Sequence, residues 1–102
     1  MKKSLTSFSR KELDAIHALS EKANGGPGGK HLEKLLLMAE EHILEIKELF
    51  AKGDLHAVIE TGDLAVLCFE IIKGSGASGD EVLGECYARF RRKLGAKLKN
   101  TN

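Results

Sequence analysis

Hydrophobic residues recur at helical spacing in four stretches of the chain, and short polar or glycine-rich segments separate these stretches. The first stretch follows Ser9 and Glu12, which have the spacing of a capping box. It ends at Asn24 and Gly25, the first residues of the connector NGGPGG. We therefore expect an N-terminal helix over residues 8–24.

Three further helices are predicted by the same signals. A long periodic stretch over residues 30–52 stops at Gly53, and Asp54 is placed to cap a helix that extends to residue 73. After the loop GSGASG, Ser78 and Glu81 repeat the capping-box spacing and open a last helix that extends to residue 94. No alternating strand pattern persists. The sequence predicts an all-α fold, a four-helix bundle in one domain over residues 1–102.

The two middle helices carry more hydrophobic surface than one small bundle covers. The helix over 30–52 has a second apolar strip at Leu37 and Leu44, and the helix over 54–73 is apolar in nearly every direction. A chain of 102 residues has few elements with which to cover both. We therefore expect a homo-oligomer, a dimer or a tetramer. In the helix over 30–52, the stripe expected to face the core consists of Leu32, Leu36, Ala39, Ile43, Ile46 and Phe50.

Acidic residues interrupt the most apolar helix. The segment VIETGDLAVLCFEII places Glu60, Asp63 and Glu70 on one face, with His56 just before it. The preceding helix has an acidic stripe of its own, at Glu41, Glu45 and Glu48. One interpretation is that both stripes are solvated, which we favour for Glu48 and Glu70. The other is that they meet across a divalent cation, because neighbouring carboxylates repel unless a cation compensates them.

Composition narrows the classes of protein. A net charge of +1 does not favour nucleic acid as a partner, and no apolar run reaches the roughly 18 residues needed to span a membrane. The N-terminus lacks the pattern of a signal peptide. Cys68 and Cys86 stand in apolar surroundings, as expected for reduced core thiols in a cytoplasmic protein.

The stretch KGDLHAVIETGDLAVL, followed by a glycine loop and SGDEVLGECYARFRRKLG, resembles the MazG-like group of all-α nucleoside triphosphate pyrophosphohydrolases. It is also similar to relatives of that group that act on phosphoribosyl-ATP. The resemblance covers residues 30–95, and it leaves residues 96–102 as a basic tail. It implies a MazG-like bundle, completed by oligomerisation, that cleaves a nucleoside triphosphate to the monophosphate and pyrophosphate with the help of Mg²⁺ or Mn²⁺.

The resemblance also implies which residues form the site. The family shows E-x-x-E on one helix and E-x-x-D on the next; the second pair is Glu60 and Asp63 here. The first pair reads Glu41 and Glu45, with His42 where the first glutamate is expected. The implied catalytic and metal-binding residues are therefore these four acids, and His42 and Glu48 are further candidate ligands. The implied phosphate-binding residues are Arg89, Arg92 and Lys93, with Arg91 in the same run.

Three classes of function remain open. The leading one is the metal-dependent pyrophosphohydrolase. The second is a catalytically degenerate MazG-like bundle that serves as a binding or assembly module, which the histidine at position 42 favours. The third is a small nucleic-acid binder that uses RFRRKLGAKLK, a short run with one aromatic residue. We expect His17, His31 and His56 to be surface or capping residues and not ligands.

Overall fold

The computed structural model describes residues 9–26 and 29–100, and within them the chain forms four helices and no strand. This confirms the all-α class and the number of helices. The last helix does not end near residue 94 as expected, but continues through most of the predicted basic tail. The helices are α1 (Arg10–Ala23), α2 (Gly29–Ala51), α3 (His56–Gly74) and α4 (Gly79–Asn100).

The predicted caps of the first and last helices are present. At the start of α1, the backbone N–H of Glu12 donates to Ser9 Oγ at 3.2 Å. At the start of α4, the backbone N–H of Glu81 donates to Ser78 Oγ at 3.4 Å. Each bond satisfies one of the N–H groups that the first turn of a helix leaves without an intrahelical acceptor.

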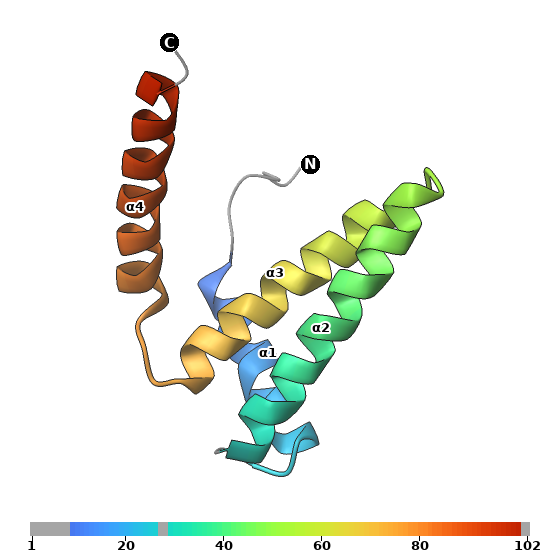
Figure 1. Cartoon of the computed structure of the whole chain (residues 1–102). Helices are drawn as coiled ribbons and strands as arrows, with labels where there is room; N and C mark the ends of the chain where they lie inside the picture. Colours follow the sequence, from blue (N-terminus) through green and yellow to red (C-terminus); the bar gives the residue numbers. More distant parts are fainter. Residues whose placement is uncertain (1–8, 27–28, 101–102) are drawn as a thin grey trace, which may run out of the picture.

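A tight turn joins α2 to α3. Gly53 adopts the left-handed conformation, with φ of 72°, and its N–H donates to the carbonyl of Phe50 at 3.0 Å. The Asp54 side chain then accepts the backbone N–H of His56 at 2.9 Å, although the N-cap position of α3 is Leu55, one residue later than predicted. The turn sends the chain back along α2, so α2 and α3 form an antiparallel pair (Figure 1).

The other two helices meet this pair in different ways. Helix α1 packs against α3, whereas α4 leaves the C-terminal end of α3 and extends away from α2 (Figure 1). Two exposed ion pairs link α1 to its neighbours: Arg10 with Asp80 at the start of α4, and Lys73 of α3 with Asp14. Within one chain, α1, α2 and α3 form the packed unit, and α4 is largely uncovered.

The inward face of α2 is rotated away from the predicted core stripe. Leu35 is 1% exposed, while Leu36, Ile43 and Phe50 of the predicted stripe are all about half exposed. Helix α2 is apolar in two directions, so hydrophobic periodicity alone does not fix its rotation. The prediction also treated histidine as a polar, outward-facing residue. The line of α2 residues that faces inward contains two histidines, so the predicted stripe was displaced from it. The residues on this line are His31, Leu35, Ala39, His42, Ile46 and Leu49. The predicted stripe was therefore right in part, since its members Leu32, Ala39 and Ile46 are half-buried.

Much hydrophobic surface stays exposed in the single chain. The buried hydrophobic residues among those described are Leu35, Ala57 and Leu67. On α4, one helical stripe is uncovered along its length, formed by Tyr87, Phe90, Leu94 and Leu98. Exposed hydrophobic surface of this extent is typical of a protein that associates with another chain.

Two further expectations concern the cysteines and the membrane. Both cysteines are free, but Cys68 is exposed and Cys86 is half-buried, so the prediction that both are core thiols was wrong. Cys68 lies on the outer side of α3, which one chain leaves uncovered. Among the described helices, none is both long and apolar enough to cross a bilayer.

Candidate cation site between α2 and α3

Two acids of α3 meet a histidine of α2 near the turn that joins these helices. The Nε2 atom of His42 lies 3.6 Å from Glu60 Oε1 and 3.9 Å from Asp63 Oδ2. Each of the three residues offers a potential metal-ligating atom within 4.8 Å of the others. We call this group the carboxylate cluster. Its members differ in exposure, since the side chain of Glu60 is 11% exposed and that of Asp63 is 58% exposed.

Local geometry explains how the carboxylate cluster forms. Glu60 and Asp63 are three residues apart, so they project from the same side of α3, and that side faces α2. On α2, the Nδ1 atom of His42 lies 2.9 Å from the carbonyl oxygen of Met38, one turn earlier. A carbonyl only accepts, so Nδ1 carries the proton and donates it. The ring is thereby held with Nε2 directed at the two carboxylates.

This orientation limits what can occupy the space between the three side chains. With Nδ1 protonated, Nε2 presents to the carboxylates either a second N–H, as in an imidazolium, or a lone pair. In the second case, three electron-rich atoms face one another, and a cation is needed to offset their repulsion. Histidines that bind metals commonly donate the other ring N–H to a carbonyl, as His42 does to Met38.

The structure brings together some of the predicted site residues and separates others. Glu60, Asp63 and His42 meet, whereas Glu41, Glu45 and Glu48 are exposed on α2 and join neither group of potential metal ligands among the described residues. Glu48 forms an exposed ion pair with Lys52 at 3.4 Å. Glu45 lies one turn after His42 and is the nearest of these acids along that side of the helix.

The predicted phosphate-binding residues do not lie at the carboxylate cluster of the same chain. Helix α4 begins beyond the C-terminal end of α3, while Glu60 and Asp63 lie in the N-terminal half of α3 (Figure 1). No ion pair within residues 9–26 and 29–100 joins α4 to these acids. The predicted residues Arg89, Arg91, Arg92 and Lys93 are all exposed.

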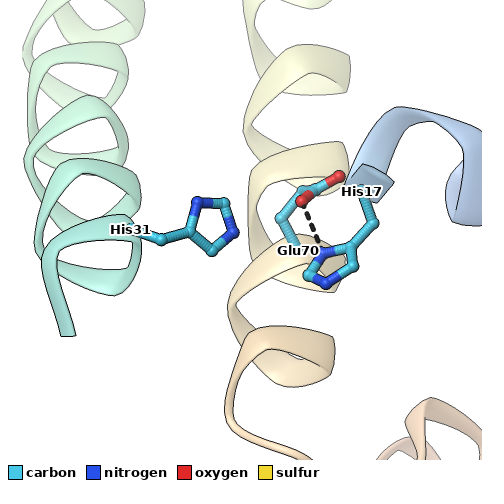
Figure 2. A group of neighbouring side chains, drawn as sticks. All are labelled: His17, His31 and Glu70. Carbon is cyan, nitrogen blue, oxygen red and sulfur yellow. Dashed lines mark hydrogen bonds and ion pairs between the residues drawn. The ribbon is translucent and has the colours of Figure 1, made fainter. Parts of the chain in front are cut away.

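A second polar group lies at the other end of α3 and contradicts two expectations. Glu70 is 3% exposed and not solvated, and His17 and His31 are buried and not surface residues. Figure 2 shows His17 and His31 on either side of Glu70, with His17 Nδ1 at 2.9 Å from Glu70 Oε1. We call these three residues the buried histidine cluster. His56, the third histidine expected at the surface or in a cap, is exposed at the start of α3.

Part of this second group was detectable from the sequence. His31 and His42 are eleven residues apart, which is close to three helical turns, so they lie on one line of α2. Glu60 and Glu70, ten residues apart, fall within about a quarter turn of each other on α3. The contribution of His17 has no comparable signal, because its position depends on how α1 crosses α3.

No protein-family model, curated protein or solved structure matches this chain. The geometry of the site and the resemblance in the sequence are therefore the basis for assigning a function.

Proposed function

We propose that this protein is a metal-dependent nucleotide pyrophosphohydrolase of the MazG-like type, which cleaves a nucleoside triphosphate to a monophosphate and pyrophosphate. The observation that carries the proposal is the meeting of Glu60 and Asp63 with His42 between α2 and α3. The two acids are those to which the resemblance assigns metal binding. They face the helix on which the partner ligands are expected.

The residues of the cluster have separate roles in this proposal. Glu60, Asp63 and His42 hold one divalent cation, with Mn²⁺ suited to the mixed carboxylate and imidazole set and Mg²⁺ to its carboxylates. When bound, the cation supplies charge to the triphosphate oxygens and acidifies a water. Exposed Asp63 lies on the open side of the cluster, where phosphates have access. Glu45, with Glu41 assisting, accepts the proton of the attacking water at a carboxylate oxygen.

The proposal requires a second copy of the chain. Positive charge is needed at the transferred phosphate, and the basic residues of α4 lie away from the carboxylate cluster of their own chain. A neighbouring copy supplies Arg89, Arg92 and Lys93 in a homo-oligomer. The exposed apolar stripe of α4 and the exposed leucines of α2 support such an assembly.

A pyrophosphate-release assay tests the proposal. Canonical and damaged nucleoside triphosphates are incubated with the protein and Mg²⁺ or Mn²⁺, and pyrophosphate and monophosphate are measured together. We expect both products in equal amounts with at least one nucleotide, and a loss of more than about 100-fold in Asp63→Asn, which removes a ligand charge. Glu33→Gln is the matched control, because Glu33 is an exposed acid of α2 outside the cluster. Equal rates in all three proteins contradict the proposal.

The alternative function is a catalytically degenerate bundle that acts as a binding or assembly module. The observation in its favour is that a histidine, and not a glutamate, is the residue of α2 that meets Glu60 and Asp63. A second N–H on His42 would offset one of the two carboxylate charges without a metal, as in a purely structural contact between α2 and α3. His42→Glu distinguishes the two functions: it restores the family pair and should raise activity in an enzyme, but it should leave a degenerate module inactive.

A further inference from the structure

The buried histidine cluster joins three helices at one point. His17 comes from α1, His31 from α2 and Glu70 from α3, and each offers a ligating atom within 4.8 Å of the others (Figure 2). The rings of the two histidines pack edge to face, with centroids 5.6 Å apart. All three residues are at least nine-tenths buried. The cluster is separate from the carboxylate cluster, which lies toward the other end of α3.

One atom of the cluster lacks a partner. His31 is 2% exposed, and its Nε2 atom is the buried side-chain nitrogen or oxygen within the described residues that has no hydrogen bond. Figure 2 shows its ring directed from α2 toward Glu70 and His17. Buried polar atoms nearly always have a partner in folded proteins. An unpaired nitrogen directed at a carboxylate and a second imidazole indicates that a ligand occupies this position.

The outer nitrogens of both rings lie beside the partners that metal-bound histidines need. When His17 ligates through Nδ1, its Nε2–H faces Glu21 Oε2 at 3.4 Å. When His31 ligates through Nε2, its Nδ1–H needs an acceptor, and the atom now 3.0 Å from Nδ1 is the amide nitrogen Nδ2 of Asn24, so this amide must flip to present its oxygen. A 180° flip of the Asn24 amide exchanges its nitrogen and oxygen and directs the oxygen at this N–H. The two orientations of an amide have nearly the same shape. Carboxylate and amide oxygens in these positions fix the ring and its tautomer.

We infer that His17, His31 and Glu70 form a binding site for a transition-metal ion of the Zn²⁺ type. Two imidazole nitrogens and one carboxylate oxygen are a typical Zn²⁺ set, whereas Mg²⁺ prefers oxygen ligands and keeps several waters. The ion ties α1 to the α2–α3 pair. Its binding therefore stabilises the position of α1, which otherwise depends on few buried contacts.

The surroundings of the cluster allow an ion to enter and leave one coordination position open. A groove of about 460 Å³ runs between α1, the end of α3 and the start of α4, and both His17 and Glu70 line it. A water reaching the ion from this groove completes a tetrahedral set. On another side, Gly74 has no side chain, and a Cβ there would lie 4.0 Å from His31 Nε2.

A calorimetric titration of the metal-free protein with Zn²⁺ tests the inference, because it measures the affinity and the number of ions bound per chain. We expect one Zn²⁺ per chain at this site, unaffected by millimolar Mg²⁺, and a rise in the melting temperature. Co²⁺ in place of Zn²⁺ should give the intense visible absorption of a four-coordinate ion. His31→Gln should abolish this tight binding and the Co²⁺ absorption, while Glu21→Gln should weaken binding about 10- to 100-fold, because it leaves all three ligands in place.

Control variants separate this site from other sites. His56→Gln removes an exposed histidine outside both clusters and should bind Zn²⁺ as the parent does. Asp63→Asn should retain the tight Zn²⁺ site, because it alters only the carboxylate cluster. Unaltered Zn²⁺ affinity in both His31→Gln and Glu21→Gln overturns the inference, as does the absence of bound Zn²⁺ in the parent. If His31→Gln fails to fold, the Co²⁺ absorption of the parent and the Zn²⁺ affinity of Glu21→Gln still test the inference.

Discussion

The imidazole of His17 lies 2.9 Å from the carboxylate of Glu70, and this contact joins the first helix to the third. Both side chains are buried, so water solvates neither of them well. The His17–Glu70 contact between α1 and α3 is buried, whereas the ion pair between Asp14 of α1 and Lys73 of α3 is half exposed. The position of α1 should therefore depend on this pair.

The stability of the metal-free protein tests this dependence. In His17→Ala, the carboxylate of Glu70 stays buried without its partner, and we expect a loss of about 3 kcal/mol in the free energy of unfolding. Asp14→Ala removes an exposed ion pair from the same helix and should cost at most about 1 kcal/mol. Urea denaturation measures both. Equal losses in the two variants would show that the buried pair has no special role.

Asp63 is expected to be a ligand and not a structural residue. Its side chain is 58% exposed and lies beside Glu60 and His42, so Asp63→Ala should change the metal-free stability by no more than about 0.5 kcal/mol. The same variant should lose the rise in melting temperature that Mn²⁺ gives the parent, since that rise depends on binding to the folded state. A large loss of stability in the metal-free melt would assign Asp63 to the scaffold.

Oligomerisation is a separate prediction. Leu37 and Leu44 are 56% and 68% exposed in the single chain, and one chain weighs 11.1 kDa. Sedimentation should give a dimer or tetramer at micromolar concentration, because packing these side chains against another copy would remove them from water. Leu44→Glu should shift the protein toward the monomer and keep its helical content. A parent protein that sediments as a monomer would contradict both the assembly and the proposed supply of α4 from a neighbour.

The shared site predicts complementation between inactive variants. Asp63→Asn lacks a ligand, and Arg92→Ala lacks a basic residue of α4, so each should be inactive as a homo-oligomer. Mixing them and allowing subunits to exchange should restore part of the activity, because some sites then combine an intact cluster with an intact neighbouring helix. If each variant retains no activity and the mixture also has none, α4 does not act across the interface.

Local signals in the sequence predicted the helices well, because capping depends on a few neighbouring residues. Ser9, Asp54 and Ser78 each accept the backbone N–H expected of them. The end of α4 was predicted too early, because Gly95 does not stop the helix there. Glycine only weakens a helix unless the following backbone turns away.

The candidate sites were harder to predict, because they depend on the rotation of α2. The hydrophobic pattern favoured Leu36 over Leu35 as the core residue, and it gave no reason to expect His31 inside the protein. Glu70 was predicted to be solvated because nothing along α3 alone shows that His17 of α1 contacts it. Contacts between helices set these positions, and a pattern along one helix does not contain them.

The most direct test of the account is whether the carboxylate cluster holds a divalent cation. The protein is titrated with Mn²⁺, and electron paramagnetic resonance measures the concentration of free Mn²⁺ at each step. The number of ions bound per chain is obtained by subtraction from the total. We expect the parent and Glu33→Gln to bind one more Mn²⁺ per chain than Asp63→Asn does. If Asp63→Asn binds as many ions as the parent, or if the parent leaves all of the Mn²⁺ free, the cluster is not a cation site.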